Sequence, residues 1–214
     1  NQTELFLKDQ FKKLKQKNID LKRDVSGIML ETFQGWGAIF YPDDFVKKLK
    51  KMIINKNILL TFDEMQAGFA RTGRAFGFEH YGVKPDIICC GKGMGGGFPL
   101  SGVLSSKKII DLAPRGSMSS THSGNPIACS AGLAVLNEIN NKKLISKSYT
   151  LGKFLIDFLN NLQREYPHII SYISGKGLIA AVIFDKSATL NINKFVGNIV
   201  EKSFHNGLLL VHTN

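Results

Sequence analysis

The sequence lacks the features that mark several specialised classes of protein. No apolar run of about eighteen residues occurs in the 214-residue chain, so we expect no membrane-spanning helix and no membrane partner. Its 3 cysteines form no C-x-x-C pair, which favours reduced thiols in the cytoplasm over a disulfide framework. The 5 histidines show no H-x-x-x-H or H-E-x-x-H spacing, so we expect no metal site.

Acidic residues are also scarce, because 17 aspartates and glutamates stand against 28 lysines and arginines, for a net charge of +11. Such a charge is common among proteins that bind nucleic acids. The lysines, however, cluster in helix-like segments without interleaved aromatic residues, at 11–17, 43–51 and 140–147. This pattern is typical of solvated helix faces, so we expect no nucleic-acid partner.

Short apolar runs alternate with amphipathic segments along the first part of the chain. The apolar runs predict strands at 25–32, 58–64, 85–90 and 101–106, the first three of them buried. The other segments predict helices at 3–18, 42–57 and 125–140. This alternation indicates an α/β fold with a largely parallel sheet flanked by helices.

The pattern of predicted elements changes after residue 140. We expect residues 1–140 to form part of a large domain, and residues 141–214 to begin a smaller, truncated α+β C-terminal domain. The second part predicts a helix, a strand, a helix and a strand, at 144–167, 176–185, 191–207 and 208–211. It carries few candidate catalytic residues.

Three polar side chains follow predicted strands at the point where each strand ends. Glu31, Asp63 and Lys92 all occupy such positions. Because ligands of parallel α/β sheets bind beyond the C-terminal ends of the strands, we expect these residues to share one pocket. Alternation along a strand puts Asp63 and its neighbour Glu64 on opposite faces, so only one of them can face that pocket.

The stretch DIICCGKGMGGGFPLSG presents two competing interpretations. Gly91, Gly93 and Gly96 match the G-x-G-x-x-G dinucleotide fingerprint, and Asp111 lies where its acidic residue would be. That fingerprint requires a helix next, whereas here more glycines and a proline follow, which cost about 1 and about 3 kcal/mol in a helix relative to alanine. No G-K-[ST] sequence occurs either, so a nucleotide-binding loop is disfavoured.

The alternative interpretation is that the glycines give clearance around Lys92, at the end of a buried strand. A lysine in such a place is suited to form an imine with a carbonyl cofactor. Pyridoxal phosphate (PLP) also needs a carboxylate that keeps its ring nitrogen protonated. Asp63, fixed at the end of its own strand, is the candidate for this partner, with Glu64 as its rival.

Four segments of the sequence resemble those of a known family. They are LETFQGWGA, LLTFDEMQAGFARTG, PDIICCGKGMGGGFPLSGV and STHSGNPIACSAGLAVL. In order and spacing they closely resemble the class III aminotransferases, PLP enzymes of fold type I that include ornithine, acetylornithine and 4-aminobutyrate aminotransferases. The resemblance implies transfer of an amino group from an amine or ω-amino acid to a 2-oxo acid, in a homodimer with the site at its interface.

The resemblance also implies roles for individual residues. Lys92 forms the imine with PLP and then shuttles a proton between substrate and cofactor carbons, and Asp63 binds the ring nitrogen. Gln66 hydrogen-bonds the ring hydroxyl, and Met65 packs against the ring face. Thr121 binds the PLP phosphate of the partner subunit.

The sequence departs from the family pattern in two places and in length. Trp36 stands where ornithine and 4-aminobutyrate enzymes have a glutamate that pairs with an arginine, so we place Trp36 and Glu31 in the substrate pocket. The alternative is that Trp36 only fills a wall. Thr32 replaces the usual proline, a change we expect to be structurally minor. The chain does not begin with Met, and we expect a central fragment with an incomplete site.

Other activities remain open at this point. An aminomutase, a racemase or a decarboxylase would share the same motifs and the same fold. A nicotinamide-dependent oxidoreductase would use the glycine stretch instead, and a degenerate relative would bind without catalysis. Retention of the lysine, the carboxylate, the glutamine and the threonine together favours transamination.

Overall fold

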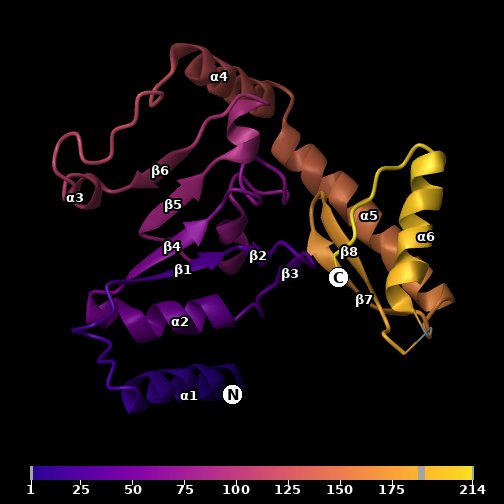
Figure 1. Cartoon of the computed structure of the whole chain (residues 1–214), viewed down its shortest axis with the longest axis horizontal. Coiled ribbons are helices and arrows are strands. Elements are labelled where there is room, and N and C mark those ends of the chain that lie inside the picture. The colour runs from indigo at the N-terminus through magenta and orange to yellow at the C-terminus, as the bar shows by residue number, and fades with distance from the viewer. Residues whose placement is uncertain (1, 188–190, 214) are drawn as a thin grey trace.

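A four-stranded sheet forms the centre of the molecule in the computed structural model, which describes residues 2–187 and 191–213 (Figure 1). Its strands are β1 (Gly27–Glu31), β4 (Leu59–Asp63), β5 (Ile87–Cys90) and β6 (Gly102–Ser105), in that spatial order. The first three are parallel and β6 is antiparallel to β5. The link into β6 holds only the short 3-10 helix η3 (Lys92–Gly95), and parallel pairing would need a longer crossover.

Helices α1 (Gln2–Gln16) and α2 (Phe45–Ile53) stack below the sheet in Figure 1, with α2 between α1 and the strands. The buried residues of α2 recur at helical spacing, at Val46, Leu49 and Ile53. They pack with Leu60 and Phe62 of β4 and with further apolar side chains into the main core. This core covers the face of the sheet that carries Leu60 and Phe62.

The expected burial of the strands is correct for β4 but wrong for β1. Leu60 and Phe62 are fully buried, whereas β1 alternates between exposed and half-buried residues and Met29 is exposed. The reason is position, because β1 lies at the edge of the sheet in the described part of the chain. A short hairpin of β2 (Phe33–Gln34) and β3 (Ile39–Phe40) follows it.

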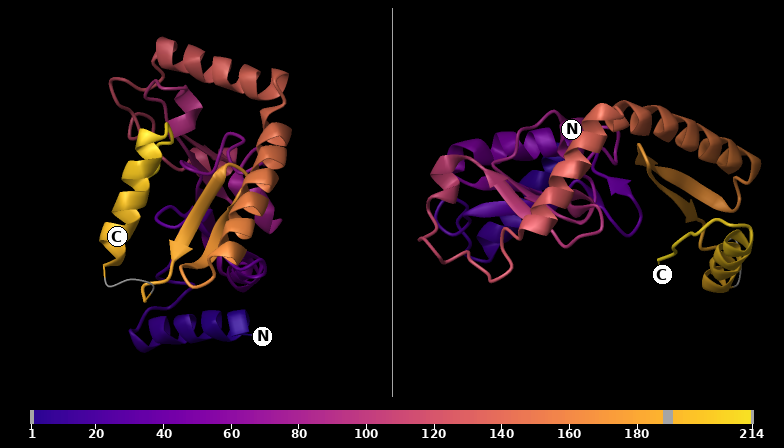
Figure 2. Two further views of the ribbon diagram at one scale, coloured as in Figure 1. Left: turned by 90° about the vertical axis from the view of Figure 1, so that its right-hand side faces the viewer. Right: turned by 90° about the horizontal axis from the view of Figure 1, so that it is seen from above.

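The short helix α3 (Lys107–Ile110) follows β6, and helix α4 (Pro126–Asn141) lies at the top of the larger body in Figure 1, in contact with η3. The elements after α4 form a smaller body beside the sheet (Figure 2). They are α5 (Leu144–Glu165), β7 (Ile170–Lys176), β8 (Ile179–Phe184) and α6 (Ile192–His205). The sequence predicted one strand at 176–185, but the structure has an antiparallel hairpin that turns at Gly177, with φ of +59°. The strand predicted at 208–211 is wrong, because these residues are exposed and pair with no strand among the described residues.

The tip of this hairpin contacts the larger body closely. The amide of Leu178 donates to the carbonyl of Arg71 at 2.9 Å, and Ser174 Oγ donates to the carbonyl of Ala38 at 2.6 Å. A Cβ atom added to Gly177 would lie 2.3 Å from the carbonyl carbon of Thr72. Only glycine fits at such a close backbone approach.

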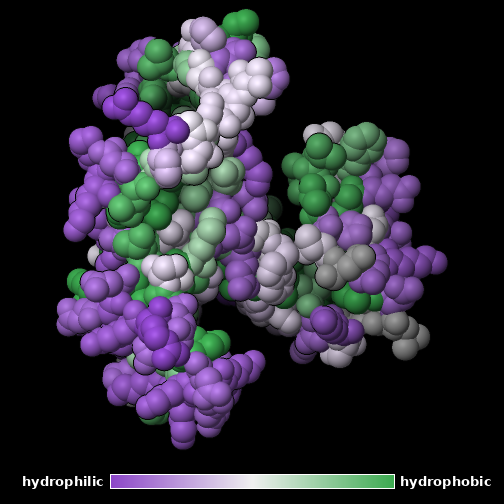
Figure 3. Space-filling view, turned by 60° about the vertical axis from the view of Figure 1, so that its left-hand side comes forward, coloured by the Kyte–Doolittle hydropathy of each residue, from purple (hydrophilic) through white to green (hydrophobic). Residues whose placement is uncertain are grey.

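The surface combines hydrophilic regions with apolar patches on both bodies (Figure 3). Exposed large apolar residues of α4 and α5 include Ile127, Leu133, Phe154 and Phe158. No helix in the described ranges is long and apolar enough to cross a membrane. Within those same ranges, no group of three or more histidine, cysteine or acidic residues is arranged to hold a metal ion.

Candidate active site

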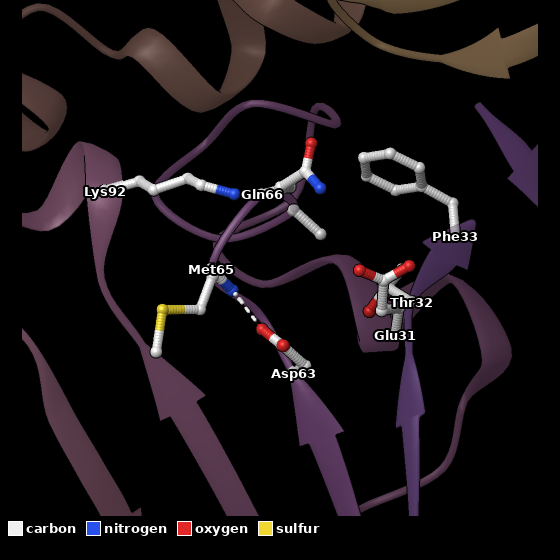
Figure 4. Close-up of a pocket in the computed structure, with 8 residues that line it drawn as sticks. Glu31, Thr32, Phe33, Asp63, Met65, Gln66 and Lys92 are labelled. Atoms are coloured by element: carbon white, nitrogen blue, oxygen red, sulfur yellow. Dashed lines mark hydrogen bonds between the residues drawn. The ribbon is translucent and has the colours of Figure 1, made fainter. Parts of the chain in front are cut away.

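A cavity opens beyond the C-terminal ends of β1 and β4 and next to the start of η3 (Figure 4). Its wall is formed by Glu31, Thr32, Phe33, Asp63, Met65, Gln66, Ala67 and Lys92. The structure therefore brings together the three strand-end residues singled out in the sequence, Glu31, Asp63 and Lys92. The short segment after β4 adds Met65 and Gln66 to the same wall.

Asp63 is the last residue of β4 and is held from both sides. Its backbone is in register with Glu31 of β1 and with Cys89 of β5. Its Oδ1 accepts a hydrogen bond of 2.9 Å from the amide of Met65 (Figure 4). Its Oδ2 has no partner among the described residues, and the carboxylate is thus fixed while one oxygen remains available to a ligand.

Glu64 points away from the cavity, as strand alternation predicted. Its side chain is fully buried and accepts hydrogen bonds from the amides of Gly77 and Phe78, at 2.7 and 2.8 Å. Burial raises the pKa of Glu64, while hydrogen bonds from Thr32 and the two amides act in the opposite direction. Of the two neighbouring carboxylates, only Asp63 lines the cavity.

Lys92 begins η3 and approaches the cavity from the β5 side. Its φ is +45°, a left-handed conformation that is uncommon for residues other than glycine and that recurs at functional sites. Its amine points toward Gln66 in Figure 4 and forms no hydrogen bond or ion pair with any described residue. The side chain is exposed, so the shielding expected from the sequence is not supplied by the described residues.

Two glycines set the close packing around these side chains. A Cβ atom on Gly91 would lie 2.5 Å from Sδ of Met65, and a Cβ atom on Gly35 would lie 2.6 Å from Nε2 of Gln66. The Gly35 amide also donates to Glu31 Oε2 at 3.3 Å. The turn between β2 and β3 therefore lies close to the Gln66 amide, and a larger residue at position 35 would have to displace that amide.

Two candidate residues lie outside this cavity. Trp36 is 62% exposed, and its carbonyl accepts a hydrogen bond of 2.7 Å from Thr213 Oγ1. Thr121 is exposed in the loop before α4 and does not line the cavity. The role predicted for Thr121 lies in the site of a partner subunit. Its position outside the cavity of its own chain therefore does not test that prediction.

Thr32 is not the structurally minor position expected from the sequence, because it bonds to Glu64 in the interior. Thr32 is fully buried, its hydroxyl donates to Glu64 Oε1, and its carbonyl accepts from the Tyr81 hydroxyl at 2.5 Å. A proline at this position would supply no such hydroxyl. The departure from the family pattern was visible in the sequence, and it was the signal that could have identified this residue.

The fit of PLP to this cavity can be judged from the polar groups that have no protein partner. Among the described residues, the Lys92 amine, the Gln66 amide and Asp63 Oδ2 have no protein partner and line one wall. An amine suits an aldehyde, a carboxylate suits a protonated ring nitrogen, and an amide suits a ring hydroxyl. This donor set fits the PLP ring.

The parallel strands, the flanking helices and this set of groups define a PLP-dependent enzyme of fold type I. The model of the family "Aminotransferase class-III" matches residues 1–214. The chain belongs to the class III aminotransferases, which are PLP-dependent enzymes.

Individual relatives agree with this assignment. The 5-aminovalerate aminotransferase of Pseudomonas putida is 37% identical over 197 residues, which are 91% of this chain and 46% of that protein. A leucine/methionine racemase of Thermococcus litoralis is 35% identical over 189 residues, which are 87% of this chain and 42% of that protein.

A solved structure of ornithine aminotransferase from Plasmodium yoelii is similar in fold. Its TM-score is 0.80 at 35% identity, with 91% of this chain and 51% of that chain covered. The present chain thus spans about half the length of the relatives and structures that it matches.

Proposed function

We propose that the protein of which this chain is a part catalyses PLP-dependent transamination, from an amine or ω-amino acid to a 2-oxo acid. One observation carries the proposal: Lys92, Asp63 and Gln66 present unpaired groups to a single cavity at the strand ends. The names of relatives, such as 5-aminovalerate aminotransferase and putrescine aminotransferase, support the substrate class.

The chemistry on the substrate comes from the cofactor, because bound PLP is an electron sink that stabilises negative charge on the substrate carbon. Asp63 holds a proton at the ring nitrogen with Oδ2, while the Met65 amide fixes the same carboxylate through Oδ1. An ionised acceptor with a fixed orientation is the group that keeps a pyridine nitrogen protonated.

Lys92 both holds the cofactor and moves a proton. Its amine lies on the cavity wall, where it would hold the cofactor and would accept and return the proton of the substrate carbon. Gln66 donates from its amide to the ring hydroxyl, and Met65 packs against the ring face. Gly35 and Gly91 leave space for these side chains, because a Cβ atom at either position would overlap Gln66 or Met65.

The remaining candidate residues are assigned to the substrate and to the partner subunit. Glu31 lines the cavity and Trp36 lies in the next turn, and we place both in the substrate pocket. In a homodimer with the site at its interface, Thr121 would bind the phosphate of the partner's cofactor. The proposed location is the cytoplasm, which suits three cysteines that are all free thiols.

A second candidate function is racemisation, which the relative named leucine/methionine racemase favours. The same lysine, aspartate and glutamine would serve it, since both reactions begin with loss of a proton from the substrate carbon. The two reactions differ in product, because a racemase returns the mirror-image amino acid and releases no oxo acid. An aminomutase would release an isomer of its substrate, and a decarboxylase would release carbon dioxide, so the products distinguish these activities too.

The test is a donor screen on the full-length protein, with 4-aminobutyrate, ornithine derivatives, β-alanine and simple amines against a 2-oxo acid. We expect at least one donor to yield its carbonyl product together with a new amino acid. The variant Lys92→Ala should lose activity by about a thousandfold or more. Transamination by that variant at the wild-type rate, or an isomer as the only product, would overturn the proposal.

A further inference from the structure

The backbone pairing of β1 with β4 ends at the cavity. The last register pair is Glu31 with Asp63, and both residues line the cavity wall. One residue further along each strand, the Thr32 hydroxyl donates to the Glu64 carboxylate. This side-chain bond therefore continues the connection between the two strands for one step beyond the last backbone pair.

Glu64 joins this connection to two other elements. Its carboxylate accepts from the amides of Gly77 and Phe78 at the start of η2 (Gly77–Tyr81). Its own amide donates to the carbonyl of Cys89 in β5 at 2.9 Å. Glu64 is fully buried and forms no ion pair within the described ranges. A carboxylate in such a place depends on these hydrogen bonds, because a buried charge without partners is costly.

Thr32 is held on its other side as well. Its carbonyl accepts from the hydroxyl of Tyr81 at 2.5 Å, and that hydroxyl accepts from the amide of Tyr41 at 3.1 Å. Thr32 is thus fixed through both its side chain and its backbone. Thr32 and its two chain neighbours, Glu31 and Phe33, all line the cavity, but the Thr32 hydroxyl is directed to Glu64.

We propose that Thr32 and Glu64 are positioning residues, which fix the end of β4 so that the Asp63 carboxylate meets the cofactor's ring nitrogen. Neither side chain is required to touch the cofactor. Glu64 directly follows Asp63, and the hydrogen bonds of its side chain and its amide restrict the peptide that joins it to Asp63. This inference rests on the proposed function, since it assigns a partner to Asp63.

The geometry explains why threonine suits position 32. A hydroxyl is needed to reach Glu64, and a buried carboxylate that loses a donor keeps an unpaired lone pair. Serine would retain the hydroxyl, and valine would remove it at nearly constant shape. The two substitutions therefore separate the hydrogen bond from the volume of the side chain.

The test compares Thr32→Val and Thr32→Ser in the full-length protein, with Thr72→Val as a matched control. Thr72 is also fully buried, and its hydroxyl bonds to the His80 ring at 3.1 Å, away from the cavity wall. Three quantities are measured: the melting temperature of the PLP-free protein, the dissociation constant for PLP, and the pH midpoint of the bound cofactor's visible absorbance band.

We expect Thr32→Val to weaken PLP binding by about fivefold to fiftyfold, as for a lost hydrogen bond to a buried charge, and to shift the pH midpoint of the band. Thr32→Ser should restore both quantities to near their wild-type values. Thr72→Val should lower the melting temperature and leave PLP binding and the band unchanged. Thr32 would then act on the cofactor through Asp63 rather than through general stability.

Two results would overturn the inference. One is a Thr32→Val protein that melts earlier but binds PLP with wild-type affinity and an unshifted band. The other is an equal loss of PLP affinity in Thr32→Val and Thr72→Val, which would mark a general effect of destabilisation. Failure of the wild-type protein to bind PLP at all would instead overturn the proposed function.

Discussion

Lys92 adopts a backbone conformation that its residue type disfavours. A left-handed φ costs an ordinary residue about 1–2 kcal/mol relative to its usual conformations. The glycines on either side permit the approach of Met65 on one side and leave open space on the other. The strain coincides with the residue that carries the proposed chemistry, which is where such outliers concentrate.

The Gln66 amide is held by its contact with position 35, and this leads to a prediction. In Gly35→Ala, the new methyl group would overlap Nε2 of Gln66 and displace the amide from the cavity wall. The clash is with the end of a flexible side chain, so we expect the melting temperature to change little. PLP affinity should fall by about fivefold, the effect of losing one hydrogen bond.

The measurement is equilibrium titration of PLP into the full-length variant, beside Gly197→Ala as the control. Gly197 lies within α6, and a Cβ atom there would contact nothing within 4 Å. The control should bind PLP normally and gain a little stability from helix propensity. Unchanged PLP affinity in Gly35→Ala would show that Gln66 is not positioned by this contact.

Expectations for single residues were confirmed where they depended only on neighbouring positions in the chain. Strand alternation was sufficient to separate Asp63 from Glu64, because it depends only on neighbouring positions. The expectation for Thr32 failed because its partner Glu64 lies 32 residues away in the chain. A long-range hydrogen bond leaves no periodic pattern in the sequence.

At the scale of elements, Asp86 connects a helix and two strands beneath the site. Its Oδ2 accepts from the Lys50 amine in α2 at 2.6 Å and from the amide of Leu60 in β4 at 2.8 Å. Burial alone would raise the pKa of Asp86, but the bonds from Leu60 and Lys50 outweigh it and lower the pKa below its usual value. Asp86 stands immediately before β5, so it fixes where that strand begins.

The lowered pKa gives a prediction with a definite sign. Stability from Asp86 is present above the pKa of the unfolded chain, about 4, and is lost as pH falls through the lower folded pKa. Asp86→Asn should therefore cost about 1–2 kcal/mol at pH 7. The difference from wild type should shrink as the pH falls below the pKa of the unfolded chain and through the lowered folded pKa.

Urea unfolding of the full-length protein across this pH range provides the measurement, with Asp111→Asn as the control. Asp111 pairs with Lys107 in an exposed position, where an ion pair contributes about 0–1 kcal/mol. A deficit of Asp86→Asn that stays constant down to pH 3 would contradict the electrostatic explanation.

The order of elements was predictable where hydrophobic patterns were strong. The strands near 58–64 and 85–90 and the helix near 125–140 fell within a few residues of their predicted bounds. The hairpin of β7 and β8 was read as one strand because β7 carries polar residues, including Ser171 and Ser174, that weaken its pattern. A strand at 208–211 would need a hydrogen-bonding partner, and no neighbouring segment of the described chain provides one.

For the whole molecule, this chain holds part of a site. Under the proposed function it supplies the lysine, the carboxylate for the ring nitrogen and the amide, while Lys92 and Thr121 are exposed. A chain of about half the length of its relatives agrees with this incompleteness. The prediction that residues 141–214 begin a separate domain stays a prediction, although α4 ends at Asn141, next to the expected boundary.

The most direct test of the central claim is to map the lysine that binds PLP. The full-length protein, loaded with PLP, is reduced with borohydride to trap the lysine–cofactor bond and is then digested for peptide mass spectrometry. The account predicts a single pyridoxyl-modified peptide, with the modification on Lys92, and none in the Lys92→Ala variant. A modification on another lysine, or no modification of PLP-loaded wild-type protein, would contradict it.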